Sequence, residues 1–381
     1  MIRVFDIVVV TIFVFVQWRV SRGLLGVLRP RVPAAWAAVL LFNLTIAAAY
    51  LCTFSELLSY FHVPPRLGML VGAASLSYLL ISVSTLAGRS LLPAVDRYAQ
   101  DRPDPGRRRV LQIASRAMLA TPVLVLGYGT FLERHDFRIR ELDVPFPDLP
   151  PGLDGLRLLH LSDIHMSAFL SESEFAAMVD AANELRPHVA AVTGDLITTH
   201  GDPLDECLRQ LGRLKADAGV VGCLGNHERY AGAEDYTAEE AARLGMRFLR
   251  GAREQLRFGG SVLNIAGVDY QGFGESYLHG ARSLTAPGAF NVMLSHNPDV
   301  FPAAVQRGYN LLLAGHTHGG QVSIEILDRQ INVARFLTPY VYGLYRSGGA
   351  AAYVTRGIGT VGIPARVGAP PEIALLRLRK A

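Results

Sequence analysis

The stretch LRLLHLSDIH, residues 156–165, decides the fold of this chain. Its first six residues, 156–161, form a short apolar run of the kind that predicts a strand buried in a sheet. The run ends in Asp163 and His165, which are two residues apart. Side chains at this spacing on an extended segment point to the same side. The stretch therefore predicts a buried strand that carries two candidate metal ligands at its carboxyl end.

The same pattern of short apolar runs continues along the chain from this point. Amphipathic stretches at 174–185 and 204–214 predict helices between the runs. Alternation of strands and helices is typical of layered α/β folds. Further buried strands are predicted at 189–193, 220–224, 262–268, 292–294 and 311–314.

Polar residues follow the predicted strands, where ligand sites of α/β sheets lie. These clusters are Asp163-Ile164-His165, Gly194-Asp195, Gly225-Asn226-His227-Glu228, Ser295-His296-Asn297 and Gly315-His316-Thr317-His318-Gly319-Gly320-Gln321. Carboxylate oxygens and neutral imidazoles bind divalent cations such as zinc, manganese and iron. An isolated Asp or His at a strand end is more often a cap or a surface group. Five clusters in succession favour one shared metal site.

The order D-x-H, G-D, G-N-H-E, H, G-H-x-H resembles the calcineurin-like metallophosphoesterases over about residues 156–321. The segments GHTHGGQ (315–321), YVTRGIGT (353–360) and PEI (371–373) are similar to the membrane-associated phosphodiesterase subgroup of that family. The resemblance implies an α/β domain at 156–381, a four-layer α-β-β-α sandwich of two sheets flanked by helices.

The resemblance also implies a role for each matching position. Asp163, His165 and His318 would hold one metal ion, Asn226, His296 and His316 would hold a second, and Asp195 would bridge the two. His227 would face the phosphoryl group as a general acid or a charge stabiliser. Glu228 stands where many members have Asp, and it would orient His227. The cofactors expected are two divalent metal ions (Mn, Fe or Zn), which lower the pKa of a shared water so that hydroxide attacks phosphorus.

The first third of the chain has a different composition. Four apolar segments predict a transmembrane region at 1–132, with helices at 4–20, 34–54, 67–88 and 111–131, followed by a Pro-rich linker at 133–155. A span needs about 20 apolar residues, and the first segment is the shortest. A cleaved signal peptide is the alternative for that segment. Its following residues, Trp18 to Arg22, offer no small-residue cleavage site.

Charge predicts how these helices are oriented. Residues 1–132 hold 13 Arg, no Lys and five acidic residues, whereas the remainder is net negative. The loops after the first and third segments are rich in Arg, which places them in the cytoplasm by the positive-inside rule. With four spans the hydrolase domain is extracytoplasmic, and with three it changes side. The basic charge is explained by these loops, so no nucleic-acid partner is expected.

Together these observations predict a multi-pass, membrane-anchored phosphoesterase with a dinuclear metal centre. The substrate expected is a phosphodiester, a pyrophosphate or a phosphomonoester, with a lipid-linked phosphate as the option that membrane anchoring favours, and membrane lipids are the other partner. The alternative is a catalytically weak metal-binding or signalling protein of the same fold, which predicts missing ligands. A membrane transporter with an accessory domain would need polar residues within the spans, and Asn43 and Thr45 are the suggestive pair.

Overall fold

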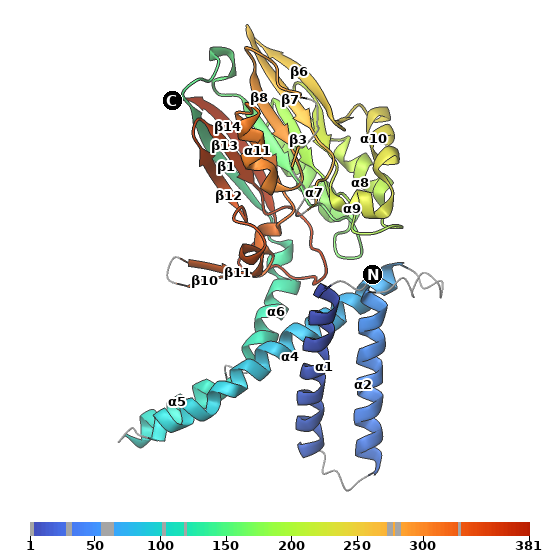
Figure 1. The fold of residues 1–381 in the computed structure, drawn as a ribbon, viewed down its shortest axis with the longest axis vertical. Coiled ribbons are helices and arrows are strands. Elements are labelled where there is room, and N and C mark those ends of the chain that lie inside the picture. The colour runs from blue at the N-terminus through green and yellow to red at the C-terminus, as the bar shows by residue number, and fades with distance from the viewer. Residues whose placement is uncertain are drawn as a thin grey trace. The chain divides into compact units, whose positions relative to one another are not determined.

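The structure, a computed structural model, describes residues 4–27, 33–54, 65–100, 104–117, 120–272, 277–278, 283–326 and 329–381. The chain divides into two compact units, Met1–Tyr128 and Gly129–Ala381 (Figure 1). Each is described by itself below.

The first unit is helical. Among the residues described in it, one segment, Arg66–Tyr98, is long and apolar enough to cross a membrane. The helices Pro105–Ala117 and Thr121–His135 pass the same test only as a pair, with a bend of 47° between them. The bundle of four spans is therefore not confirmed. The helices are α1 (Val4–Val27), α2 (Pro33–Phe54), α4 (Pro65–Gln100), α5 (Pro105–Ala117) and the start of α6 (Thr121–Phe131).

The predicted span at 111–131 falls on two described helices, and residues 118 and 119 between them lie outside the described part of the chain. Helix α5 ends at Ala117 and α6 begins at Thr121. Pro122 occupies the first turn of α6, where a proline is tolerated because the amide it lacks would have no partner in the helix.

Polar side chains connect helices α1, α2 and α4 of this unit. Asn43 donates a hydrogen bond to Ser21 Oγ at 2.8 Å, and Tyr78 donates one to Gln17 Oε1 at 2.8 Å. Thr45 donates to the carbonyl of Leu41 within its own helix. Asn43 therefore makes a contact between helices and Thr45 one within its own helix. Neither contact supports the transporter alternative.

The second unit contains two six-stranded sheets. In the first, the order is β1-β14-β2-β3-β4-β5, and β2 to β5 run parallel. In the second, the order is β12-β13-β9-β8-β7-β6, with parallel strands at its centre and antiparallel strands at both edges. The strands of the first sheet are β1 (Arg138–Phe146), β2 (Arg157–Leu161), β3 (Val189–Thr193), β4 (Val220–Cys223), β5 (Arg247–Phe248) and β14 (Glu372–Lys380). Those of the second are β6 (Ala252–Phe258), β7 (Ser261–Gly267), β8 (Phe290–Leu294), β9 (Leu311–Ala314), β12 (Gly343–Ser347) and β13 (Ala350–Val354).

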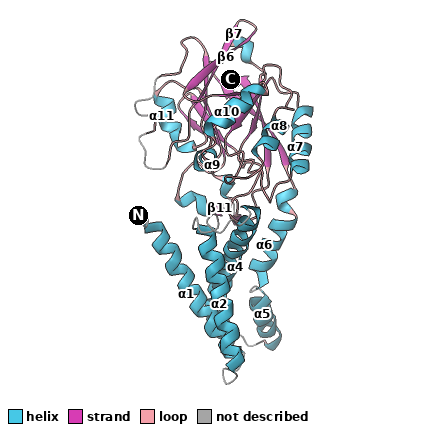
Figure 2. Ribbon diagram, turned by 90° about the vertical axis from the view of Figure 1, so that its right-hand side faces the viewer, coloured by secondary structure: helices cyan, strands magenta, loops and turns pink. Residues whose placement is uncertain are grey.

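Alternate residues of the strands face two different cores. Leu159 of β2 packs with the helices on the outer face of the first sheet, whereas Leu158 packs against the second sheet. This period of two follows from the pleat of a strand. In Figure 2 the strands lie in the middle of the unit, with α7 and α8 on one side and α11 on the other. The mixed α/β fold that the sequence predicted is confirmed. The helices are α7 (Glu172–Glu184), α8 (Leu204–Leu211), α9 (Asn226–Ala231), α10 (Glu234–Arg243) and α11 (Phe301–Gln306).

The predicted linker at 133–155 is part of the folded unit. It contains β1, which pairs in parallel with β14 from Arg138 opposite Glu372 to Phe146 opposite Lys380. Most residues of β1 are exposed, but Val144 and Phe146 are buried in the core between the sheets. Prolines and charged residues obscured this edge strand in the sequence, and edge strands tolerate proline.

Replacing Phe146 tests whether residues 138–146 are a strand of the core, as the structure has them, or part of a linker, as the sequence predicted. The ring packs edge-on against Phe290 with centroids 4.9 Å apart. Removing a buried phenylalanine costs about 3–5 kcal/mol. We therefore expect Phe146→Ala to lower the melting temperature of the full chain in detergent by roughly 10 °C, whereas the neighbouring Pro147→Ala changes it little. Equal melting temperatures would contradict a core position for β1.

Candidate metal centre

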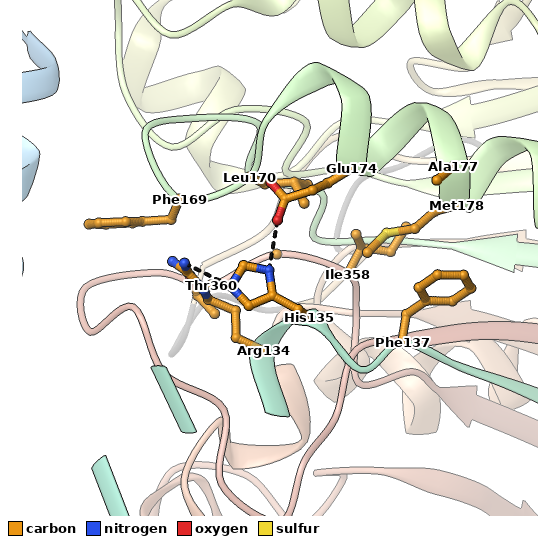
Figure 3. Close-up of a pocket in the computed structure, with 11 residues that line it drawn as sticks. Arg134, His135, Phe137, Phe169, Leu170, Glu174, Ala177, Met178, Ile358 and Thr360 are labelled. Carbon is orange, nitrogen blue, oxygen red and sulfur yellow. Dashed lines mark hydrogen bonds and ion pairs between the residues drawn. The ribbon is translucent and has the colours of Figure 1, made fainter. Parts of the chain in front are cut away.

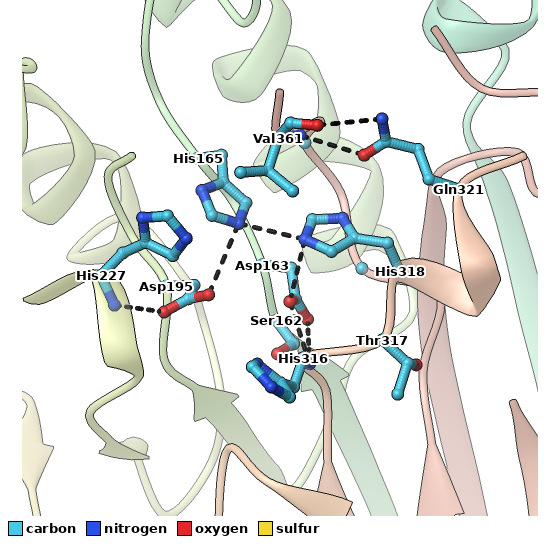
Figure 4. A network of polar contacts seen from close by, with 12 residues as sticks. Ser162, Asp163, His165, Asp195, His227, His316, Thr317, His318, Gln321 and Val361 are labelled. Carbon is cyan, nitrogen blue, oxygen red and sulfur yellow. Dashed lines mark hydrogen bonds and ion pairs between the residues drawn. The ribbon is translucent and has the colours of Figure 1, made fainter. Parts of the chain in front are cut away.

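The predicted ligands lie on loops at the carboxyl ends of five strands, and the structure brings them together. The loops after β2, β3 and β4 come from the first sheet, and those after β8 and β9 from the second. Figure 4 shows side chains from the loops after β2, β3, β4 and β9 gathered around Asp163 and Asp195. All nine predicted site residues lie in this region: Asp163, His165, Asp195, Asn226, His227, Glu228, His296, His316 and His318.

Three overlapping groups of side chains have geometry suited to a metal ion. Within each group the candidate ligand atoms all lie within 4.8 Å of one another. His165 belongs to two of the groups, and so does Asp195. The groups are Asp163 with His165 and His318, His165 with Asp195 and His227, and Asp195 with His296 and His316.

Asp195 occupies the middle of this arrangement. Its Oδ2 lies 2.9 Å from Nε2 of His296 and 3.5 Å from Nε2 of His165. On one side, Nε2 of His318 is 3.1 Å from Nε2 of His165. On the other, Nδ1 of His316 is 3.1 Å from Nε2 of His296. One carboxylate therefore lies between two pairs of imidazole nitrogens, which is the geometry that a bridging ligand needs.

Asn226 supplies an independent indication of a cation. Its side chain is buried, at 5% exposure, and Oδ1 has no hydrogen-bond partner within the described parts of the chain. A buried amide oxygen without a partner costs free energy. An amide oxygen is also a ligand for hard divalent cations. The donor set of Asp, His and Asn therefore fits divalent metal ions.

Burial keeps two of the imidazoles neutral. It lowers the pKa of His165 to about 3 and that of His316 to about 3. His296 differs: burial is the largest single effect and lowers its pKa, but the charge and hydrogen bond of Asp195, the charge of Asp163 and the hydrogen bond to the Thr193 carbonyl together raise the pKa to about 9. Burial would raise the pKa of Asp195, but His296 and His227 hold it well below its usual range. The carboxylate is thus ionised, as a metal ligand must be.

The backbone is constrained at the same positions. Positive φ angles occur at Asp163 (51°), His165 (47°), Asp195 (55°), His316 (73°) and His318 (52°). Non-glycine residues rarely adopt this region, and such strain concentrates at functional sites. Both Asp163 oxygens accept from the amide of His316, at 2.9 and 3.1 Å. Oδ1 of Asp195 accepts from the amide of His227 at 2.9 Å. Each carboxylate is therefore fixed by the loop that carries another candidate ligand.

Two glycines allow these contacts. A Cβ on Gly225 would collide with Oδ1 of Asp195, and one on Gly315 would collide with Oδ2 of Asp163. Neither has positive φ. These glycines are needed because the loops approach the carboxylates closely.

The predicted role of Glu228 needs a correction. Its fully buried carboxylate does not hydrogen-bond to His227; it accepts from the amides of Asp195 at 2.9 Å, Leu196 at 2.6 Å and Gly225 at 2.8 Å. The group that holds the ring of His227 is the carbonyl of Thr198, 2.5 Å from Nδ1. Glu228 therefore joins the loops after β3 and β4, because the Glu side chain is long enough to reach backbone amides of both.

Arg356 and Arg366 lie in the segments that follow β13. Arg356, considered in the sequence as a phosphate or ion-pair partner, places its guanidinium carbon 4.0 Å from the centre of the Tyr342 ring. Arg366 was not singled out, and its side chain is fully buried beside His318. A lone arginine after a Gly-rich stretch carries no sequence signal of burial, so its position could come only from the structure.

A mostly apolar pocket lies beside the residue segment 358–360 (Figure 3). Its volume is about 180 Å³. Among its lining residues, His135 lies between Arg134 and Glu174: Nε2 accepts from Arg134, and Nδ1 is 2.7 Å from Oε1 of Glu174. Gly359, one of the lining residues, donates its amide to the carbonyl of Asp163. The pocket and the candidate metal centre thus share one backbone segment.

Comparisons with known proteins agree with the metallophosphoesterase resemblance that the sequence motifs of this domain suggest. Relatives include a transmembrane protein with a metallophosphoesterase domain from Danio rerio, 29% identical over 369 residues, covering 90% of this chain and 80% of that one. The uncharacterized metallophosphoesterase YkuE of Bacillus subtilis is 29% identical over 260 residues, covering 66% of this chain and 89% of that one. The family model of the calcineurin-like phosphoesterases matches residues 156–320. Residues 156–320 of this chain therefore match a calcineurin-like phosphoesterase domain, and the relatives similar to this chain carry the same kind of domain.

Proposed function

We propose that the chain is a membrane-anchored phosphoesterase with two divalent metal ions. The observation that carries the proposal is the position of Asp195, whose Oδ2 lies between His296 and His165 while Oδ1 is held by the amide of His227. A carboxylate shared by two ligand groups is what a dinuclear centre requires. The unpartnered Oδ1 of Asn226 supports the second ion.

Asp163, His165 and His318 would hold one ion, and Asn226, His296 and His316 the other, with Asp195 between them. Bound there, the two ions would supply positive charge that draws the phosphoryl group and lowers the pKa of water. The chain contributes orientation. Amides of other loops fix the carboxylates, and burial keeps His165 neutral so that its lone pair is available.

His227 is the residue we propose for proton transfer. With Nδ1 engaged by the carbonyl of Thr198, Nε2 is the nitrogen available to a phosphoryl or leaving-group oxygen. The ring lies 4.7 Å from that of His165, centroid to centroid, so it is next to the ligands. A catalytically weak binding protein would lack one of these groups. The chain has all of them, which favours turnover.

For the substrate we propose a phosphodiester, pyrophosphate or phosphomonoester, with a lipid-linked phosphate as the preferred class. The support is location: relatives with the same domain are named transmembrane proteins, and the chain has the apolar helix Arg66–Tyr98. Enzymes anchored in a bilayer meet substrates dissolved in the same bilayer at high local concentration. We further propose a multi-pass chain with the phosphoesterase domain on the extracytoplasmic side, supported by the Arg-rich loops.

Asp195→Asn tests the shared carboxylate. The substitution keeps the shape but removes the negative charge that would bind both ions. We expect turnover of a model phosphodiester to fall by about 100-fold or more, and the uptake of Mn²⁺ by the metal-stripped protein to fall below two equivalents. A chelator should abolish wild-type turnover, and added Mn²⁺ should restore it.

The matched control is Asp217→Asn. Asp217 precedes β4, at the end of the sheet opposite to the ligand loops, and its side chain is 72% exposed. Turnover and metal uptake should stay at the wild-type level. Wild-type turnover in Asp195→Asn would refute the role of the shared carboxylate.

A reporter enzyme that is active only outside the cytoplasm tests the orientation. Fused after Asp136, before β1 begins at Arg138, it leaves the helices intact. We expect an active reporter at this point and an inactive one when it is fused after Asp104, in the Arg-rich loop. The reverse pattern would place the phosphoesterase domain in the cytoplasm.

A further inference from the structure

Arg366 is a charged side chain with no exposure to solvent. Among the described residues it forms no ion pair with a carboxylate, although a buried charge is costly without compensation. Its guanidinium group instead donates to backbone carbonyls. Nη1 donates to the carbonyl of Arg356 at 2.7 Å and to those of His318 and Ala369 at 3.2 Å each, and Nε donates to the carbonyl of Gly359 at 3.0 Å.

These carbonyls belong to segments next to one group of candidate ligands. The carbonyl of His318 belongs to a ligand itself. The amide of Gly359 donates to the carbonyl of Asp163 at 2.6 Å, and a Cβ on Gly359 would collide with Ile164 and His165. Arg366 is therefore bonded to the loop of His318 and to the segment that packs on Asp163 and His165. None of the hydrogen bonds of its side chain is made to Asn226, His296 or His316, which are all among the described residues.

The backbone of Arg366 is fixed as well. Its amide donates to the carbonyl of Gly129 at 3.1 Å, and the amide of Gly368 donates to Oε2 of Glu133 at 3.1 Å. The planar guanidinium holds five donors in a rigid fork. Anchored at its base, it can hold several carbonyls in one geometry. Nη2 also lies 3.3 Å from Nδ1 of His318, but the carbonyls supply the restraint.

We propose that Arg366 is a positioning residue for one metal ion only, the ion held by Asp163, His165 and His318. Residues that orient ligands from behind contribute about 10–100-fold to metal affinity. The ion held by Asn226, His296 and His316 does not depend on Arg366. The inference rests on the proposed function because it requires that two metal ions bind. It does not depend on which substrate is hydrolysed.

The test is a calorimetric titration of Mn²⁺ into the metal-stripped full chain in detergent. Arg366→Met removes the donors and keeps the length of the side chain. We expect one Mn²⁺ equivalent to weaken by about 10–100-fold, while the other keeps its wild-type affinity. The weakened equivalent should be the one lost in His318→Ala. At one added equivalent the variant should give the electron paramagnetic resonance spectrum of isolated Mn²⁺.

Arg247→Met is the matched control. Arg247 lies on β5 and also donates to a carbonyl, that of Ala218, while pairing with Glu254 at 3.0 Å. Its loss should lower the melting temperature and leave both Mn²⁺ affinities unchanged. Arg366→Lys keeps the charge without the fork, and it should show the same selective loss if Arg366→Met does not fold.

Two results would overturn the inference. One is wild-type affinity for both equivalents in the Arg366 variants. The other is an equal weakening of both equivalents, which is what a general loosening of the fold predicts. Failure of the wild-type chain to bind two equivalents of Mn²⁺ would instead refute the dinuclear centre of the proposed function, and this inference with it.

Discussion

The structure of the second unit depends on how three buried carboxylates are compensated. Asp163, Asp195 and Glu228 are almost entirely removed from solvent. An ionised carboxylate in such a place is costly unless donors or cations surround it. In this chain the donors are backbone amides, and each carboxylate accepts from a loop that follows a different strand. The contacts that offset the loss of hydration therefore also fix the loops relative to one another, across both sheets.

The amide contacts do not use every polar atom of this region. After the amide contacts are made, Oδ2 of Asp195 still faces imidazole nitrogens, and Oδ1 of Asn226 has no hydrogen-bond partner among the residues that the structure describes. The ligand backbone is also strained, since left-handed conformations at non-glycine residues cost about 1–3 kcal/mol each. The apolar cores on both faces of the sheets stabilise the fold and so offset the free energy of this strain. A rigid, partly unsatisfied centre is preorganised for ions, because it need not rearrange when they bind.

The sequence predicted the inner strands and the ligand clusters well because both are local features. The run 189–193 coincides with β3, and 311–314 with β9, since buried strands leave continuous apolar runs. Strand β1 was missed because its charged residues face solvent and only Val144 and Phe146 face the core. The partners of Arg366 were not predictable at all, because its acceptors are backbone carbonyls, which every residue has.

Glu228 shows how the length of an acidic side chain decides which backbone amides it can reach. An Asp there would be about 1.5 Å shorter. It could still cap the start of α9 through Gly225, but it would lose the amides of Asp195 and Leu196 unless the loops moved closer. With Glu, the loop after β4 is tied directly to the residue that lies between the two candidate ion sites. Since Thr198 already holds His227, the acid at position 228 is free to fix the backbone of Asp195. The longer side chain therefore fixes the backbone of Asp195 and leaves the ring of His227 to its contact with the Thr198 carbonyl.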